Sequence, residues 1–250
     1  MDSISLDSMK EVQLMDRLDS KFVADSLLLP QLLRKMISYF RVQDIGGVRI
    51  AAYSTQYLDT PEISMYEMHH NRKLNRQKVR IRSYLDSNLS FLEVKNKSNI
   101  GRTAKLRVPT QLTHIEQIEE LNEGVVFLRE NTDVDVEKLL PSLANEFKRI
   151  TFVNNELTER ITIDTDLRFT NHMTGKEIVL DGVMIIELKQ EGNVSSYFRD
   201  ILTEMRIKKT KISKYCIGTV LTNPDCKYNR FKKKSRDINK LINQNTNDSN

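Results

Sequence analysis

The stretch from Arg76 to Arg107 constrains the fold most, because three segments within it alternate basic and apolar side chains. The basic positions are Arg76, Lys78, Arg80 and Arg82, then Lys95 and Lys97, then Lys105 and Arg107. A two-residue period is typical of β-strands, whose successive side chains point to opposite faces of a sheet. Turn residues separate the segments, with Asp86-Ser87-Asn88 after the first and Gly101 after the second. The pattern predicts three consecutive antiparallel strands that share one cationic face and one apolar face.

The cationic face of these strands has two interpretations. An antiparallel sheet often exposes one charged face to water, and lysine and arginine are common there. Glu93 is, however, the one acidic residue among the basic positions, and like charges on adjacent strands repel one another. An anion bound among these side chains would remove that repulsion. The three strands alone do not decide between a solvated face and an anion-binding site.

The positive charge of this chain is concentrated locally. The formal net charge is +5, from 39 basic and 34 acidic residues, and residues 227–236 hold six basic residues and no acidic one. The other 33 basic residues nearly balance the 34 acidic residues. A protein that binds nucleic acid non-specifically is usually basic over much of its surface. We therefore do not expect nucleic acid as a partner.

Composition also bounds the class of protein and its compartment. Hydrophobic residues make up 39% and charged residues 29% of the chain, which is typical of soluble globular proteins. No apolar run is long enough for a transmembrane helix, and the N-terminal sequence MDSISLDSMKEV is acidic and polar, unlike a signal peptide. Cys216 and Cys226 are the only cysteines, which argues against a disulfide framework. These features predict a cytoplasmic protein.

The rest of the chain predicts further strands and helices. Strands are expected at 12–24, 48–59, 147–154, 157–164, 167–171, 177–180 and 182–190. Helices are expected at 26–40, 61–72, 194–206 and 213–221, with two or three more over 110–144. We expect an N-terminal extension over 1–11, a single domain over 12–222 with a helical insertion at about 110–145, and a tail over 223–250. From Asn229 the tail is expected to start as a basic helix, and the composition of its polar end, NQNTNDSN, predicts disorder.

Several of the predicted strands carry charges on the face that a closed sheet would turn inward. Burying so many charges in a filled core would be costly. A closed barrel with a wet, polar interior avoids that cost and leaves no exposed sheet edge. A half-open sheet with a charged cleft is the structural alternative.

A series of short motifs runs through residues 12–222. In order they are Arg17-Leu-Asp-Ser-Lys21, Tyr57-Leu-Asp-Thr-Pro61 with Tyr66, Arg80-Ile-Arg82, Glu93-Val-Lys95, Lys105, Glu159-Arg160, Glu187-Leu-Lys189 and Ser213-Lys214-Tyr215. As an ordered set they resemble the motifs of VTC domains, the polyphosphate polymerase domains of the triphosphate tunnel metalloenzyme (CYTH-like) superfamily. The resemblance implies an α+β fold built on an antiparallel β-barrel tunnel of about eight strands, with flanking and inserted helices.

The resemblance also implies an activity and a site. The enzyme would be an ATP:polyphosphate phosphotransferase that moves the γ-phosphoryl of ATP onto a growing inorganic polyphosphate chain, with Mn²⁺ or Mg²⁺ as cofactor. The phosphate-binding residues would be Lys21, Arg80, Arg82, Lys95, Lys105, Arg160, Lys189 and Lys214. The catalytic residues among them would be Arg80, Arg82, Lys95, Arg160 and Lys214. Glu187 would hold the metal, and Glu93 would be either a second ligand or the salt-bridge partner of a neighbouring basic residue.

One motif departs from the wider superfamily. Its E-x-E-x-K pattern is replaced here by R-x-D-x-K, with Asp19 at the central acidic position. The departure argues against a metal role at this strand and against a simple triphosphatase of the E-x-E-x-K kind. The alternatives to the polymerase are a tunnel triphosphatase, a non-catalytic polyphosphate- or nucleotide-binding module, and a basic nucleic-acid binder. ATP and inorganic polyphosphate are the expected partners, and any coupling to a membrane would have to come from another protein.

Other residues with chemical potential are expected to have structural roles. His69 and His70 are adjacent, so on a helix they diverge by about 100° and cannot share a face. Asp164 and Asp166 suit turn capping, with metal binding as the alternative, and Cys216 suits a helix core. The basic cluster from Lys232 to Arg236 is either a solvated end or a contact for acidic lipid, nucleic acid or polyphosphate.

Overall fold

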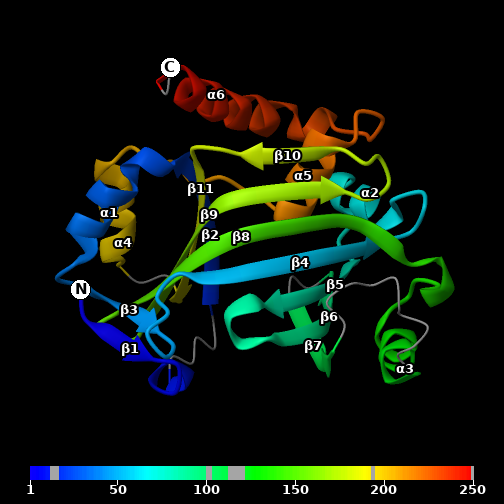
Figure 1. Ribbon diagram of the computed structural model, residues 1–250, viewed down its shortest axis with the longest axis horizontal. Helices are drawn as coiled ribbons and strands as arrows, with labels where there is room; N and C mark the ends of the chain where they lie inside the picture. Colours follow the sequence, from blue (N-terminus) through cyan, green and yellow to red (C-terminus); the bar gives the residue numbers. More distant parts are fainter. Residues whose placement is uncertain (12–16, 100–102, 112–121, 193–194, 249–250) are drawn as a thin grey trace.

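The computed structural model describes residues 1–11, 17–99, 103–111, 122–192 and 195–248 of the 250-residue chain. Its main feature is one large antiparallel sheet with the strand order β2-β11-β9-β8-β4-β5-β6-β7 (Figure 1). These strands are β2 Arg17–Asp25, β4 Ala51–Asp59, β5 Arg76–Tyr84, β6 Leu89–Lys97, β7 Thr103–Thr110, β8 Leu140–Asn154, β9 Glu159–Asn171 and β11 Val183–Glu191. At its margins lie β1 Ser3–Ser5, β3 Phe40–Asp44 and β10 Glu177–Leu180. The predicted α+β fold with an antiparallel sheet of at least eight strands is confirmed.

The sheet curls so that its first strands approach its last ones. In a flat sheet, β2 and β6 would lie about 29 Å apart, because they are six strand spacings of about 4.8 Å from each other in the strand order. The pKa of Lys95 on β6 is nevertheless lowered to about 8, first by burial and second by the positive charge of Lys21 on β2. Lys21 also lines one cavity together with Arg76 of β5 and Lys97 of β6. The sheet therefore encloses a tunnel-like interior, although no hydrogen bonds join β2 to β7 in the described part of the chain.

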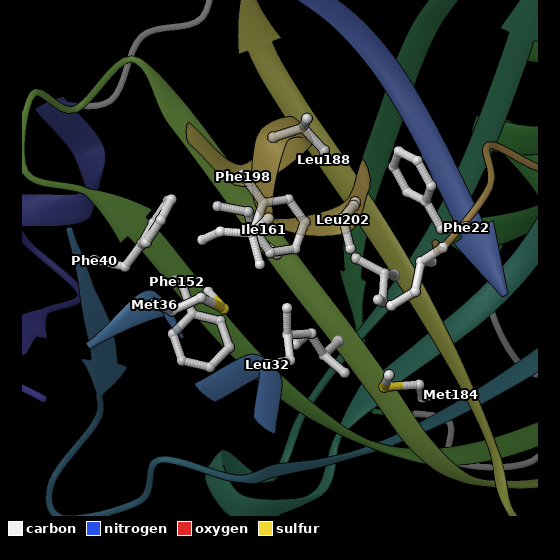
Figure 2. Packing of buried hydrophobic residues seen from close by; sticks show 14 of the residues in the cluster. Phe22, Leu32, Met36, Phe40, Phe152, Ile161, Met184, Leu188, Phe198 and Leu202 are labelled. Atoms are coloured by element: carbon white, nitrogen blue, oxygen red, sulfur yellow. The ribbon is translucent and has the colours of Figure 1, made fainter. Parts of the chain in front are cut away.

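Helices cover the sheet from several sides. They are α1 Leu29–Met36, α2 Ser64–His70, α3 Asn122–Asn131, α4 Tyr197–Glu204, α5 Lys214–Thr222 and α6 Lys232–Asp248. Helices α1 and α4 pack on the outer face of β2, β8, β9 and β11 (Figure 2). Leu32 and Phe198 from these helices pack there with Phe22, Ile161 and Leu188. Within the described residues, no helix combines the length and the apolar character needed to cross a membrane.

The apolar side of the cationic strands is buried under the chain segment around α3. Val79 and Ile81 of β5 pack with Leu92 of β6 and with Leu128 of α3. All four side chains are 1% exposed or less. The basic residues that alternate with them therefore point to the opposite side, into the interior of the curled sheet.

Helix α5 closes one end of this interior. Its residues Tyr215 and Ile217 pack with Phe147 of β8 and Phe169 of β9. Gly218 lets the helix approach this closely, since a Cβ atom there would lie 2.4 Å from the Phe169 ring. The N-terminal end of α5, with Ser213 as its cap, consequently faces the charged part of the interior.

Three predicted elements differ in the structure. The helix expected up to residue 144 is wrong at its end, because β8 begins at Leu140 and pairs with β4. The leucines at 139, 140 and 143 fit a helical spacing as well as a strand, and Pro141 disfavours a helix interior. Residues 112–121, which include His114 and part of the predicted insertion, lie outside the described residues.

The other two differences have local causes. The strands expected at 157–164 and 167–171 are one strand, β9, which stays continuous through an irregularity where Asp166 has a φ of 52°. The helix expected at the start of the tail is present as α6, but it extends to Asp248, into the polar end expected to be disordered. Its apolar residues Ile238, Leu241 and Ile242 follow a helical spacing and pack with the core around α5.

Candidate active site

Strand register gathers the predicted site residues on the inner face, by which we mean the side of the sheet that faces the interior. Directly opposite residues of antiparallel neighbours point to the same side of a sheet. The opposed pairs are Lys21 and Glu187, Glu187 and Thr162, Lys189 and Arg160, Arg149 and Asp164, Arg80 and Glu93, and Lys95 and Lys105. Lys214 reaches the same face from the first turn of α5. The structure therefore brings together all the residues predicted to bind phosphate or metal.

Glu93 is the centre of one charged cluster. Arg80 donates from Nε and Nη2 to Oε2 of Glu93, at 2.8 and 2.6 Å, and Lys105 Nζ lies 2.5 Å from Oε1. The Glu93 side chain is 1% exposed. Burial alone would raise the pKa of its carboxyl group, but Arg80 and Arg82 outweigh burial and lower this pKa to about 2. Both carboxylate oxygens thus have cationic partners, which fits the salt-bridge interpretation of Glu93 rather than the metal ligand.

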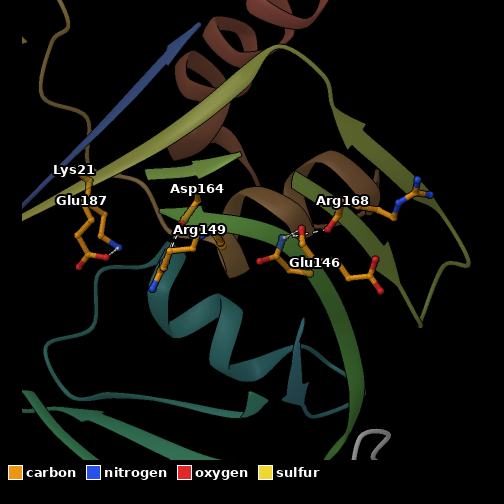
Figure 3. Close-up of polar contacts among 8 residues, drawn as sticks. Lys21, Glu146, Arg149, Asp164, Arg168 and Glu187 are labelled. Atoms are coloured by element: carbon orange, nitrogen blue, oxygen red, sulfur yellow. Dashed lines mark hydrogen bonds and ion pairs between the residues drawn. The ribbon is translucent and has the colours of Figure 1, made fainter. Parts of the chain in front are cut away.

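Asp164 is the centre of a second charged cluster (Figure 3). Arg149 donates to its two oxygens at 2.6 and 2.8 Å, and Lys214 Nζ donates to Oδ2. Burial would raise the pKa of Asp164, but Arg149 and Lys214 together hold it well below its usual range. Burial in turn lowers the pKa of Lys214 to about 7, against the opposing effect of Asp164.

Arg149 belongs to the site although the sequence motifs do not predict it there. The available signal is the alternation of Phe147, Arg149 and Thr151, which places Arg149 on the inner face of β8. Its partner, Asp164, does not cap a turn as expected, since its carboxylate accepts from Arg149 and Lys214. Asp166, by contrast, forms an exposed ion pair with Lys148 at 3.0 Å.

Arg82 interacts electrostatically with residues of both clusters. Burial, followed by the neighbouring guanidinium groups of Arg80 and Arg149, lowers its pKa to about 10, whereas Glu93 opposes the shift. Within the described residues Arg82 forms no ion pair, and its buried Nε atom has no hydrogen-bond partner. A guanidinium group in this state has its donors free for a bound anion.

Glu187 has a more accessible carboxylate than Glu93 or Asp164. It forms an ion pair with Lys21, at 3.9 Å, and its side chain is 20% exposed. Burial would raise its pKa, but Lys21 and Lys189 lower it to about 2, so the group is ionised. The hydroxyl of Thr162, directly opposite, is buried without a hydrogen-bond partner. Figure 3 shows Glu187 and Lys21 pointing into the same interior as Arg149.

The residues present fit a divalent cation only in part. Among the described residues, no three His, Cys, Asp or Glu side chains gather in a way that would hold a metal ion. Magnesium and manganese, however, are commonly held by one or two carboxylates, with water and substrate phosphate oxygens completing the shell. Glu187 with the Thr162 hydroxyl beside it meets that smaller requirement.

Two further lysines border the cap of α5. Lys78 donates from Nζ to Ser213 Oγ at 2.7 Å, and Lys95 lies opposite Lys78 on β6. Burial lowers the pKa of each to about 8, and Lys21 contributes to both shifts. Lys78 belongs to the alternating basic pattern, although the sequence motifs do not mark it as a site residue.

The motif around Asp59 has a structural role. Asp59 accepts hydrogen bonds from the backbone N–H groups of Thr60, Met65 and Tyr66, at 2.8, 2.8 and 2.9 Å, and from the hydroxyl of Tyr215. It therefore ties the start of α2 to α5. Because α5 carries Lys214, Asp59 fixes a side chain of the inner face without touching that face itself.

The remaining candidates have mostly packing roles. His70 is buried and its Nε2 atom lies 2.6 Å from Asn229 Oδ1, while burial lowers the pKa of His69 to about 2. Cys216 is 2% exposed in α5, which confirms its predicted place in a helix core. His172 lies near Gln56, with the two side-chain nitrogens 3.4 Å apart.

Comparison with solved structures finds several similar chains of low sequence identity. HpAC1 from Hippeastrum, described as a candidate adenylyl cyclase with a dominant triphosphatase activity, has a TM-score of 0.50 at 14% identity. The match covers 83% of this chain and 97% of HpAC1. PH1819 from Pyrococcus horikoshii has a TM-score of 0.45 at 15% identity, covering 80% of this chain and 96% of that one. At these identities the likeness concerns the fold alone.

A further match from Vibrio parahaemolyticus, described as a candidate adenylate cyclase, has a TM-score of 0.46 at 11% identity, with 80% and 96% of the two chains covered. No curated protein matches this chain. The VTC domain profile, in contrast, matches residues 16–223, which include every strand from β2 to β11 and helices α1 to α5. The inner-face cations of that span and the sheet that positions them are thus parts of one recognised domain, and the chain belongs to the VTC domain family.

Proposed function

We propose that this protein is a metal-dependent polyphosphate polymerase that transfers the γ-phosphoryl group of ATP to the end of an inorganic polyphosphate chain. The observation that carries the proposal is the composition of the inner face. Cations predominate there, and the carboxylates of Glu93 and Asp164 are each held by two of these cations. Such a site suits a substrate and a product that are both polyanions.

Transfer to phosphate, as proposed here, does not depend on a general base. In the proposed step, an anionic terminal oxygen of polyphosphate attacks the γ-phosphorus, and the bond to the β-phosphate oxygen breaks with its electron pair leaving on ADP. An anionic nucleophile gives up no proton, so the step needs no general base. The lowered pKa values of Glu93, Asp164 and Glu187, and of His69 nearby, make all four poor bases near neutral pH. Burial lowers the pKa of Lys214 to about 7, so Lys214 is the inner-face group that transfer to water would use as a base.

The basic residues would divide the work of holding phosphate. Arg82, with its unpartnered Nε, would grip the triphosphate directly, because a guanidinium group binds two phosphate oxygens at once. Arg80 and Arg149 are oriented by Glu93 and Asp164 and would present their remaining donors. Positive charge around the chain of phosphates would come from the other basic residues of the inner face, namely Lys21, Lys95, Lys105, Arg160, Lys189 and Lys214. This arrangement would position the phosphate groups and neutralise their negative charge, which is most of what phosphoryl transfer requires.

Glu187 would hold the metal in this proposal, with Thr162 beside it. When bound, Mn²⁺ or Mg²⁺ would neutralise charge on the β- and γ-phosphate oxygens. Glu93, whose oxygens are occupied, would instead position Arg80 and Lys105. Lys21, at 3.9 Å from Glu187, would add positive charge beside that carboxylate.

A tunnel triphosphatase is the second candidate, and the fold shared with HpAC1 favours it. Labelled substrate separates the two. The full chain is incubated with Mn²⁺ and ATP labelled in the γ-phosphoryl group, and the products are resolved by gel and digested with an exopolyphosphatase. The polymerase predicts label in a digestible polymer. Label found only in free phosphate would support the triphosphatase, and tight ATP binding without either product would support a binding module.

A further inference from the structure

A cavity of about 570 Å³ adjoins the inner face, with which it shares Lys21, and we call it the vestibule. Its basic lining comes from distant parts of the chain. Arg72 follows α2, Arg76 begins β5, Lys97 ends β6, Lys211 precedes α5, and Arg230 and Lys234 belong to the C-terminal segment. Strands, a connecting segment and the C-terminal helix thus present positive charge to one space.

Most basic residues of the vestibule have no acidic partner among the described residues. Asp19 is the one acidic side chain in its lining. In the part of the chain that the structure describes, Arg72, Lys97, Lys211 and Arg230 form no ion pair. Like charges around a concave surface repel one another and concentrate an attractive potential for anions. The lining is therefore suited to an anionic ligand.

Packing holds the C-terminal cations in place. Phe231 lies against Tyr66 and His70, with ring centroids 6.2 and 5.9 Å apart, and Ile238 is 2% exposed in the core around α5. Lys234 lies over the Phe231 ring, with Nζ 5.4 Å from its centroid. This segment lies beyond residues 16–223, the span matched by the family. The vestibule is consequently built partly by residues that the domain match does not include.

The vestibule is continuous with the inner face. Lys21 belongs to both, since it lines the vestibule and pairs with Glu187. Arg76 is also the first of four basic residues along β5, which follow one another at two-residue steps of about 6.8 Å. The row ends at Arg82, so closely spaced cations lead from the vestibule to the unpaired guanidinium group of the inner face.

We propose that the vestibule binds inorganic polyphosphate, holding the part of the chain that extends away from the reacting end. This inference rests on the proposed function and names a second contact for the same substrate. A linear polyanion fits a cavity lined by separated cations from several elements. A nucleotide base fits it poorly, because the aromatic ring available there, Phe231, already lies against Tyr66 and His70 and beneath Lys234.

The test compares two triple variants of the full chain that remove the same number of charges. The vestibule variant is R72A/K211A/R230A, and the control is K232A/K233A/K240A, from exposed positions of α6 outside the vestibule lining. Binding of long-chain polyphosphate, inorganic tripolyphosphate and ATP is measured by titration calorimetry. We expect the vestibule variant to bind long-chain polyphosphate about tenfold more weakly, with a smaller dependence on salt. Its affinities for tripolyphosphate and ATP should stay within about twofold of the parent.

Each other outcome has a defined meaning. If the control variant bound long-chain polyphosphate equally weakly, the effect would be one of net charge, and the proposed vestibule site would be wrong. Loss of ATP affinity in the vestibule variant would assign the cavity to the nucleotide and also overturn it. These measurements need no turnover. A parent protein that makes no polymer but binds long-chain polyphosphate through the vestibule would therefore contradict the proposed function and leave the vestibule intact.

Discussion

Arg149 and Asp164 face each other across β8 and β9 and form a two-point ion pair, with Nε 2.6 Å from Oδ1 and Nη2 2.8 Å from Oδ2. Lys214 from α5 donates to the same carboxylate. Asp164 is 3% exposed and so has little water to replace either partner. Removing one member of a buried ion pair leaves the other charge uncompensated, which usually costs more than the pair itself contributes.

The first prediction concerns this carboxylate. D164N should lower the free energy of unfolding by about 3 kcal/mol, because Arg149 and Lys214 lose their counter-charge. Tripolyphosphate should recover part of that loss, since a bound anion takes the place of the carboxylate. Denaturant unfolding with and without tripolyphosphate measures both effects. D166N, two residues away at an exposed pair, is the control and should change stability by less than about 0.5 kcal/mol. Equal destabilisation by the two variants would contradict the role given to Asp164.

The second prediction contrasts two arginines on the same strand. R82A should weaken tripolyphosphate binding about tenfold or more. It should not destabilise the unliganded protein, because among the described residues Arg82 has no ion-pair partner whose charge would be left uncompensated. R80A should weaken binding and turnover and also destabilise the protein, since it leaves Glu93 with Lys105 alone. Calorimetric titration and thermal unfolding of both variants separate the two effects. A marked loss of stability in R82A would show that Arg82 is structural.

The third prediction isolates the metal. E187Q keeps the shape of the side chain but removes the charge that a divalent cation needs. Turnover with ATP across a manganese titration should fall about a hundredfold or more. Tripolyphosphate binding without metal should change little. E177Q, at an exposed ion pair with Arg168, provides a control that should keep parental turnover. Parental activity in E187Q would exclude Glu187 as the ligand and make Glu93 the next carboxylate to test.

The fourth prediction concerns pH. The pKa values of Lys78 and Lys95 are lowered to about 8, so both lose charge as pH rises from 7 to 9. Tripolyphosphate affinity should fall over this range. The stability of the unliganded protein should change in the opposite sense. Because the folded-state pKa values lie below the ordinary 10.5, the unfolded chain binds more protons between about pH 8 and 10.5, and stability rises with pH there.

Substitution identifies the groups responsible for the pH effect. K78M and K95M should each flatten the fall in tripolyphosphate affinity between pH 7 and 9, and their binding at pH 9 should approach that of the parent. Binding curves at several pH values and constant ionic strength provide the measurement. A pH profile that stays unchanged in both variants would assign the titration to the ligand or to other groups.

The part of the site that lies on regular strands could be predicted from the sequence. Alternation reports directly which side chains share a face, so the amino-acid pattern alone groups Arg80, Arg82, Lys95 and Lys105. The resemblance to VTC domains adds Glu187, and the structure places it on the same face. The curvature of the sheet, which turns this face into an interior, has no such local signal.

What could not be predicted depends on pairing between distant segments. Arg149 and Asp164 meet because β8 and β9 pair with one irregularity in register, and a periodicity within either strand does not reveal that irregularity. The sequence leaves two roles open for Glu93 for the same reason, since its partner Lys105 is set by the register of β6 and β7. Helix α6 could not be predicted over its full length, because the polar composition of its end hides a short apolar stripe.

The most direct test of the polymerase proposal is the balance of products from ATP and Mn²⁺, followed by phosphorus NMR in a single reaction. The proposal predicts that ADP accumulates together with resonances of internal polyphosphate groups, while free phosphate stays a minor product. R82A should slow both products together. Release of one free phosphate for each ADP, with no internal polyphosphate resonance, would contradict the proposal.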